Sequence, residues 1–239
     1  MSSPVSAVIL AAGAGSRLGA LGRQHSKAMV PVAGRPLIDW VIERLRAGGV
    51  EALVVVRHVA DAALDSHLRA RWPAAAIAVQ RERLGIADAL CRALPLLGNA
   101  PAYLACACDS LFAAADIGAL IAAGADGSAA VGVLDLGVAA TASRSAVRLD
   151  GNRVVDIVEK PAPGAAPSGL VAAPLYWLPR AVDAYLASAA AQGDERYVSV
   201  ALAAFARAGG VVRAVRLRER LEVTTASDVD AVAAVLCRP

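Results

Sequence analysis

Apolar segments typical of buried strands alternate with amphipathic helical segments through the first half of the chain. The segment VSAVILAAG at residues 5–13 is almost entirely apolar and ends in small residues, which predicts a buried strand. The same alternation predicts strands over 52–58, 75–80 and 102–109 and helices over 35–49, 61–72 and 85–97. Such an order favours a mostly parallel sheet with helices on both faces. We therefore predict an α/β fold built on a Rossmann-like mixed sheet.

The pattern changes after residue 125. Four further strand-like segments follow without clear helices between them, which predicts an antiparallel insertion; they cover 128–136, 145–150, 153–160 and 170–178. Helices are expected over 180–190 and 197–208, then a strand over 211–217 and a last helix from Thr225. Thr225 and Asp228 have the spacing of a capping box. We predict one domain, residues 1–239, with the change of pattern dividing it into halves 1–125 and 126–239.

Composition excludes several classes of protein. The chain of 239 residues is 57% apolar, but it has no apolar run of the ~18–20 residues that a membrane span needs. Its amino-terminal segment has no basic region or cleavage pattern of a secretion signal. The four cysteines form no CxxC pair. With a net charge of +3 and 4% aromatic residues, binding to nucleic acid is not expected. We expect a soluble, reduced, cytoplasmic protein that binds neither nucleic acid nor membrane.

Lysine is nearly absent from the chain. The sequence contains 22 arginines and two lysines, Lys27 in HSKAMVP and Lys160 in VEKP. Lysine carries a compact, rotatable charge, whereas the guanidinium of arginine is a planar fork. A chain that uses arginine almost everywhere and keeps lysine twice indicates two sites where a cation contacts phosphate in little space.

A glycine-rich loop follows the first strand. Gly13 and Gly15 allow backbone N–H groups to turn towards a phosphate. Glycines at this spacing also occur in the dinucleotide loops of NADP-dependent oxidoreductases, and this reading stays open at this point. A short-chain dehydrogenase would in addition carry a Tyr-x-x-x-Lys pair, and none of the four tyrosines has a lysine four residues later.

The opening of the chain resembles a known enzyme family. The segments LAAGAGSRLG and SKAMVPVAGRPLIDWVIERLRAGGV are similar to the start of the nucleoside-diphosphate-sugar pyrophosphorylases, the sugar-1-phosphate nucleotidyltransferases. The resemblance implies transfer of a nucleotidyl group from a nucleoside triphosphate to a sugar 1-phosphate with release of pyrophosphate. It also implies that 1–125 is the nucleotide-binding half and 126–239 the acceptor-binding half. Phosphoryl transfer of this kind depends on positioning and charge neutralisation.

The same resemblance assigns residues to the nucleotide. Arg17 would neutralise the departing pyrophosphate, and Lys27 would contact the α-phosphate; both are the expected catalytic residues. Gln80 and Gly85 have the spacing of the base-reading segment of uridylyl- and thymidylyltransferases, which favours UTP or dTTP. The loop residues expected to bind the nucleotide are Leu10, Ala11, Ala12, Gly13, Ala14, Gly15 and Ser16, and the backbone of the last four would line the triphosphate.

Four further residues are assigned to the acceptor and the metal. Lys160 would hold the phosphate of the sugar phosphate, and Glu159 would accept hydrogen bonds from sugar hydroxyls. Asp109 comes at the end of the fourth strand, where open α/β sheets bind ligands, and a carboxylate there suits Mg²⁺. Glu222 takes the place at which the family brings its second metal ligand. Mg²⁺ is therefore the expected cofactor, held by Asp109 and Glu222.

Other readings stay open for the substrate and the class of protein. Related proteins join cyclitol, inositol or choline phosphates to nucleotides, so a cytidylyl- or guanylyltransferase is the first alternative. A second class is a non-catalytic nucleotide or sugar sensor, which would have lost the charges that Arg17, Lys27, Asp109 and Lys160 retain. We expect a standalone transferase without an appended acyltransferase domain, and a homo-oligomer is possible within the family.

Overall fold

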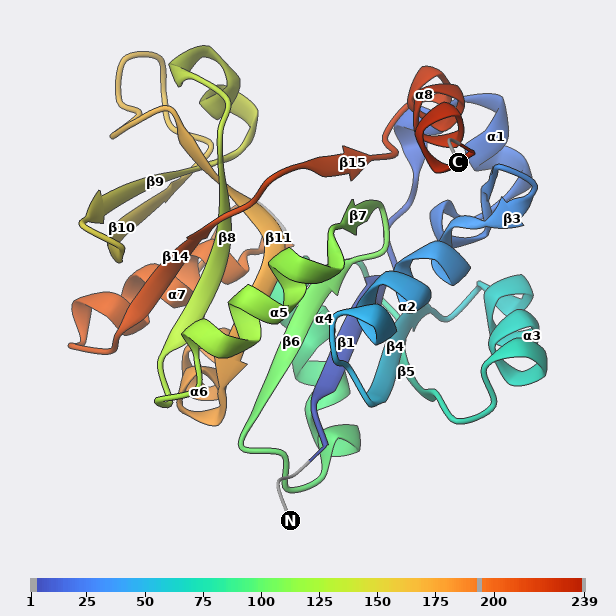
Figure 1. The fold of residues 1–239 in the computed structure, drawn as a ribbon, viewed down its shortest axis with the longest axis horizontal. Helices are drawn as coiled ribbons and strands as arrows, with labels where there is room; N and C mark the ends of the chain where they lie inside the picture. Colours follow the sequence, from blue (N-terminus) through green and yellow to red (C-terminus); the bar gives the residue numbers. More distant parts are fainter. Residues whose placement is uncertain (1–3, 193–194, 238–239) are drawn as a thin grey trace.

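The computed structural model describes residues 4–192 and 195–237. Its centre is a nine-stranded sheet with the strand order β5-β4-β1-β6-β11-β8-β14-β10-β9 (Figure 1). In chain order its strands are β1 (Ser6–Ala11), β4 (Ala52–His58), β5 (Ala76–Gln80), β6 (Ala102–Ala107), β8 (Ala129–Asp135), β9 (Ser145–Asp150), β10 (Arg153–Glu159), β11 (Leu170–Pro179) and β14 (Val212–Arg216). In the described part of the chain, no helix is long and apolar enough to cross a membrane.

The first half of the chain forms the predicted parallel part of this sheet. Strand β1 pairs in parallel with β4 and with β6, and β4 pairs in parallel with β5. The crossover helices are α2 (Leu37–Ala47), α3 (Ala62–Arg71) and α4 (Ile86–Ala93). The α/β fold expected from the alternating segments is confirmed.

Helices cover both faces of the sheet and divide the core in two. Ile9 of β1 belongs to one apolar cluster and its neighbour Leu10 to the other, because successive side chains of a strand point to opposite faces. Buried side chains of α2, α3, α5 (Ala114–Ala123) and α8 (Ala226–Leu236) contribute to the first cluster. Those of α4, α6 (Asp183–Ala187) and α7 (Val198–Arg207) contribute to the second. The front helices α2 and α5 are visible in Figure 1.

Helix α2 shows how the sequence determines these elements. Its predicted apolar face, Leu37, Ile38, Val41 and Leu45, is completely buried or nearly so. The chain then turns at Gly48, where an added Cβ would lie 2.5 Å from Ile117 of α5. A side chain at position 48 would therefore push α2 and α5 apart.

The second half is the mixed part of the sheet. Strand β11 runs antiparallel to β6 and β8, and β10 runs antiparallel to β9, as the sequence predicts. The strand predicted over 211–217 is β14, which runs parallel to β8 and is reached through α7. The last helix, α8, begins with the expected capping box of Thr225 and Asp228.

Several elements are absent from the sequence prediction. They are α5, a five-residue helix α1 (Ala20–Gln24), and three short strand pairs, β2 (Pro31–Val32) with β3 (Arg35–Pro36), β7 (Ser110–Phe112) with β15 (Arg220–Glu222), and β12 (Ala191–Gln192) with β13 (Glu195–Arg196). The pair β7–β15 matters most, because it attaches a segment near the carboxyl end of the chain to the turn after β6.

Candidate active site

Two adjoining cavities lie at the carboxyl ends of β1 and β6. The first has a volume of about 410 Å³ and is lined by the glycine-rich loop, Lys27 and Asp109, among others. The second has a volume of about 290 Å³ and is lined by Lys160, Glu222 and Asp109, among others. Arg17, Asp109 and Tyr197 belong to the walls of both. The two lysines of the chain therefore face two neighbouring spaces that meet at Arg17 and Asp109.

The glycine-rich loop leaves β1 and turns back on itself at Gly15. This residue has φ 63°, in the left-handed region that glycine adopts readily, and its carbonyl accepts a hydrogen bond from the amide of Leu18 at 3.0 Å. Six of the seven loop residues assigned to the nucleotide line the first cavity: Leu10, Ala12, Gly13, Ala14, Gly15 and Ser16. Ala11, the seventh, is the last residue of β1 and is buried in the core.

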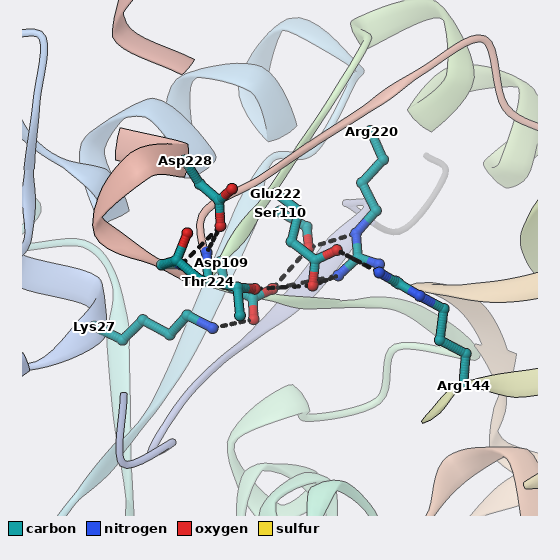
Figure 2. Close-up of polar contacts among 9 residues, drawn as sticks. Lys27, Asp109, Ser110, Arg144, Arg220, Glu222, Thr224 and Asp228 are labelled. Carbon is teal, nitrogen blue, oxygen red and sulfur yellow. Dashed lines mark hydrogen bonds and ion pairs between the residues drawn. The ribbon is translucent and has the colours of Figure 1, made fainter. Parts of the chain in front are cut away.

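Lys27 lies in a single turn of 3-10 helix, Lys27–Met29, and points at Asp109 (Figure 2). Its Nζ donates a hydrogen bond to Oδ2 of Asp109 at 2.6 Å. The two side chains are only 11% and 19% exposed. Burial alone raises the pKa of the Asp109 carboxyl, but the nearby charges of Lys27 and Arg220 and the hydrogen bonds from Lys27 and Ser110 outweigh it. The pKa of Asp109 is therefore lowered from its usual 3.8, and this carboxylate is ionised at neutral pH.

Asp109 is held in place by its own turn and by β15. The hydroxyl of Ser110 donates to Oδ1 of Asp109 at 2.7 Å, and the amide of Val223 donates to the Asp109 carbonyl at 2.8 Å. In the antiparallel pair β7–β15, Ser110 lies opposite Glu222. Residues 220 and 222 lie on the same face of β15 because side chains alternate along a strand. The pairing therefore brings two charged side chains of β15 next to Asp109.

These two charged residues are Arg220 and Glu222. Nη2 of Arg220 lies 3.1 Å from Oε1 of Glu222 and 3.7 Å from Oδ1 of Asp109. Oε2 of Glu222 accepts from both terminal nitrogens of Arg144 at 3.3 Å. The sequence expectation for Glu222 is a metal ligand; in the structure its carboxylate is engaged by two arginines. Figure 2 shows these two guanidinium groups approaching Glu222 from the side opposite Lys27.

Lys160 and Glu159 line the second cavity at the end of β10. Nζ of Lys160 donates to the hydroxyl of Tyr197 at 2.6 Å, and this hydrogen bond raises the pKa of Lys160. Oε2 of Glu159 accepts from Ser145 at 2.5 Å and from Ser199 at 2.6 Å. Lys160 also has φ 44°, a left-handed conformation that costs a non-glycine residue about 1–2 kcal/mol. Residues with such strain recur at active sites and ligand-binding sites.

Gln80 has a fixed orientation in the first cavity. The residue is 3% exposed, and its Nε2 donates to Oδ2 of Asp88 at 2.9 Å and to the carbonyl of Gly85 at 3.2 Å. Because both partners are acceptors, the amide nitrogen must face them, and the amide oxygen remains as the group that can accept from a ligand.

Gly85 lines the first cavity and also makes a close contact within the chain. The sequence reading has this glycine allow a close approach of the nucleotide. In the structure the chain itself also approaches this glycine: with φ 91°, a Cβ at Gly85 would lie 2.5 Å from the backbone nitrogen and oxygen of Arg196. The amide of Arg196 donates to the carbonyl of Leu84 at 2.9 Å. Gly85 thus permits β13 to pack against this turn, and β13 places Glu195 in the wall of the first cavity.

The comparison with known families decides the class of this chain. The family described as nucleotidyl transferase matches residues 6–209. The chain belongs to this nucleotidyl transferase family. The resemblance seen in the glycine-rich loop and the lysine segment is thereby confirmed, and the loop is that of a nucleotidyl transferase rather than of an NADP-dependent oxidoreductase.

Individual relatives of this nucleotidyl transferase match over shorter stretches. The chain is 39% identical over 109 residues to N-acetylmuramate alpha-1-phosphate uridylyltransferase of Caulobacter vibrioides, which covers 43% of the chain and 45% of the relative. It is 47% identical over 60 residues to CMP-5'-(3-aminopropyl)phosphonate synthase of Streptomyces rubellomurinus, covering 25% and 10%. The chain thus spans less than half of the length of these curated relatives.

A solved structure shares the fold over nearly the whole chain. UDP-glucose pyrophosphorylase in complex with UDP-glucose superposes with a TM-score of 0.86 at 17% identity, covering 98% of both chains. At this identity the likeness establishes the fold of the nucleotidyl transferase and not its substrate.

The site of this nucleotidyl transferase contains residues that sequence reasoning did not single out. They are Arg83, whose Nε donates to the carbonyl of Ala12 at 3.1 Å, and Arg144, Tyr197 and Arg220 in the cavity walls. Nothing in the sequence separates these arginines from the other arginines of the chain. Only the pairing of distant segments shows which of them face the cavities.

Proposed function

We propose that this nucleotidyl transferase joins a nucleoside triphosphate, UTP or dTTP, to a sugar 1-phosphate and releases pyrophosphate in a Mg²⁺-dependent reaction. The observation that carries the proposal is the position of the two lysines. Lys27 and Lys160 line two cavities that share Arg17 and Asp109. The reaction requires such an arrangement, because the phosphate of one substrate must reach the α-phosphorus of the other. An oxygen of the sugar phosphate attacks the α-phosphorus, the bond from this phosphorus to the bridging oxygen breaks, and pyrophosphate leaves with the electron pair.

The first cavity suits the triphosphate. Backbone groups of the loop from Gly13 to Ser16 line it, and Arg17 supplies a guanidinium at its junction with the second cavity. Lys27 is the group that neutralises the α-phosphate. Its ammonium, bound to Asp109 in this structure, exchanges that partner for phosphate oxygens when the nucleotide binds. Such fixed charges aimed at the reacting phosphate lower the barrier of the transfer.

The divalent cation fits at Asp109. No group of three or more His, Cys, Asp or Glu side chains able to hold a metal occurs among the residues that the structure describes. Mg²⁺ commonly binds through one or two carboxylates and takes its other ligands from phosphates and water. Asp109 faces both cavities and is ionised, so it is the residue that would hold the ion. Mg²⁺ bound there supplies additional neutralisation of the phosphate charge.

The second cavity suits the acceptor phosphate. Lys160 is its compact cation, and Arg144 and Arg220 add two guanidinium groups to its wall. Glu159 is fixed by two serine hydroxyls on Oε2, which leaves Oε1 to accept from an acceptor hydroxyl. The cations can bind the phosphate and Glu159 can bind a hydroxyl group, so the cavity suits a phosphate ester with hydroxyl groups, such as a sugar 1-phosphate.

The orientation of Gln80 favours a uracil or thymine base. Its amide oxygen can accept, and N3 of uracil and thymine carries a hydrogen to donate, whereas N3 of cytosine is an acceptor. The uridylyltransferase among the relatives agrees with this choice. The CMP-forming relative supports the alternative, a cytidylyltransferase acting on a different phosphate or phosphonate.

A pyrophosphate-release screen tests the proposal. UTP, dTTP, CTP, GTP and ATP are each combined with sugar 1-phosphates, cyclitol phosphates, phosphocholine and an aminoalkylphosphonate in the presence of Mg²⁺. We expect release with UTP or dTTP and a sugar 1-phosphate, and loss of release in Asp109→Ala. Release with CTP and a non-sugar acceptor would select the alternative, and absence of release with every pair would reject the proposed function.

A further inference from the structure

One guanidinium nitrogen lies between the two carboxylates that the sequence assigns to the metal. Nη2 of Arg220 is 3.1 Å from Glu222 and 3.7 Å from Asp109 (Figure 2). A Mg²⁺ ion binds carboxylate oxygens at about 2.1 Å. An ion held by both carboxylates would therefore occupy the space that this nitrogen fills.

Arg220 is anchored in this position from a second side. Its Nε donates to the hydroxyl of Ser110 at 2.9 Å, and Ser110 in turn donates to Asp109. The Arg220 side chain is only 9% exposed. A buried guanidinium that lost its carboxylates to a divalent ion would remain next to that ion without a counter-charge, which is strongly unfavourable. The two carboxylates can therefore hold either Arg220 or a shared metal ion.

Glu222 has no oxygen left over for a metal. Oε1 accepts from the hydroxyl of Thr224 at 3.0 Å in addition to Arg220, and Oε2 accepts from Arg144. Asp109 differs in one respect. Its Oδ2 accepts from Lys27, and under the proposed function Lys27 binds phosphate instead once the nucleotide is present, which frees this oxygen for a metal. Asp109 can therefore bind a metal ion in the nucleotide-bound protein, whereas Glu222 cannot.

We propose that Arg220 is a built-in cation that takes the place of the metal between Asp109 and Glu222. Glu222 is then a positioning residue that holds Arg220, and it is not a metal ligand. Mg²⁺ is bound through Asp109 alone among the carboxylates described here, together with the phosphates of the nucleotide. The role of the nucleotide phosphates in this assignment rests on the proposed function. The competition between Arg220 and a metal ion does not, because it takes place in the nucleotide-free protein.

Binding of Mn²⁺ to the nucleotide-free protein, followed by the electron paramagnetic resonance signal of free Mn²⁺, tests the competition. We expect weak binding to the native chain. In Arg220→Gln the two carboxylates lose their cation, and we expect one site that binds Mn²⁺ at least about tenfold more tightly. The double variant Arg220→Gln/Glu222→Gln should lose this gain. Arg216→Gln, an exposed arginine on β14, is the matched control and should bind as the native chain does.

A second variant covers the case in which Arg220→Gln does not fold. Arg220→Lys keeps a positive charge beside the carboxylates, so it should bind Mn²⁺ as weakly as the native chain. In addition, the Mg²⁺ concentration for half-maximal pyrophosphate release should change by less than about twofold in Glu222→Gln and rise by at least about tenfold in Asp109→Asn.

Two results would overturn this assignment. One is tight, saturable Mn²⁺ binding to the native chain that Glu222→Gln abolishes, because Glu222 would then be a ligand. The other is a folded Arg220→Gln protein whose Mn²⁺ affinity is unchanged. Neither result depends on activity, so they are distinct from a failed pyrophosphate screen, which would reject the proposed function and leave the metal competition to the Mn²⁺ titrations.

Discussion

The ammonium nitrogen of Lys27 lies 2.6 Å from Oδ2 of Asp109, although the two residues are 82 positions apart in the chain. Each is the charge partner of the other in the nucleotide-free protein. Phosphate groups entering the first cavity offer Lys27 new partners and release one oxygen of Asp109. A change at either residue therefore affects both the empty site and the loaded one.

Lys27→Arg should be nearly inactive although it keeps the charge. The Lys27 side chain is 11% exposed, and its Cβ would be 3.4 Å from a Cβ at Gly15. The guanidinium of arginine is larger and planar and places its nitrogens differently from the ammonium of lysine, and a displacement of about 1 Å can cost about 100-fold in rate. We expect kcat/KM for pyrophosphate release to fall by at least about that factor. The reverse change at an exposed site, Arg23→Lys, is the control; native-like turnover of Lys27→Arg would contradict the argument.

Asp109→Asn should destabilise the protein more at neutral pH than in acid. The lowered pKa of Asp109 means that its ionised form stabilises the fold above the usual value of 3.8, and that this contribution is lost as the pH falls through the folded-state pKa. Removing the charge leaves Lys27 and Arg220 poorly paired, at a cost of about 1–3 kcal/mol. Urea unfolding at pH 7.5 and near pH 3 measures the difference, which should shrink in acid. Asp150→Asn, an exposed change, should stay within about 0.5 kcal/mol at both pH values.

Asp88→Asn should weaken discrimination between bases. The carboxylate of Asp88 fixes the amide of Gln80, whereas an asparagine can present either end of its own amide and allow Gln80 to reverse. We expect kcat/KM with UTP to fall about tenfold, equivalent to about 1.4 kcal/mol, while that with CTP falls less. Arg92→Gln removes the other partner of Asp88, which lies 3.1 Å away, and is the matched control. An unchanged UTP to CTP ratio in Asp88→Asn would show that Gln80 does not read the base.

Gly85→Ala should lower the stability of the protein more than the same substitution at a glycine with a similar φ angle. Gly209 has φ 93°, close to the 91° of Gly85, but a Cβ at Gly209 would meet nothing within 4 Å, whereas one at Gly85 would collide with Arg196. Gly209→Ala therefore measures the conformational cost alone, about 1–2 kcal/mol. Gly85→Ala should lose at least about 1 kcal/mol more and raise the KM for the nucleotide, because β13 moves. Equal losses of thermal stability in the two variants would exclude the packing explanation.

The sequence determines the large elements of this fold more clearly than the site. Strand β1 and helix α2 are recognised because their apolar spacing is local, and the glycine-rich loop follows β1 directly. Strands β7 and β15 contain three residues each and exist because they pair with each other. No local pattern in SLF or RLE predicts this pairing, since neither segment is stable as a strand by itself.

The same limit applies to individual site residues. Asp109 is predicted from its place after a strand, and Lys27 from the rarity of lysine. Arg220 lies in the basic segment RAVRLRER, where neither residue type nor spacing distinguishes one arginine from another. Its distinction comes from Ser110, 110 positions earlier in the chain. Gly85 shows a related limit, because a glycine at this place predicts a close approach to its backbone but does not identify the approaching atoms, which include those of Arg196.

The pairing of β7 with β15 also has a consequence for synthesis of the protein. A ribosome synthesises the polypeptide from its amino terminus. The glycine-rich loop, Lys27 and Asp109 therefore leave the ribosome before Arg220 and Glu222. A nascent chain that ends before β15 has most residues of the first cavity, including Lys27, but it lacks Arg220 and the Val223 amide that help to hold Asp109. Chains that are terminated or cleaved before residue 220 should therefore be unable to transfer the nucleotide, and activity should require residues 220–223.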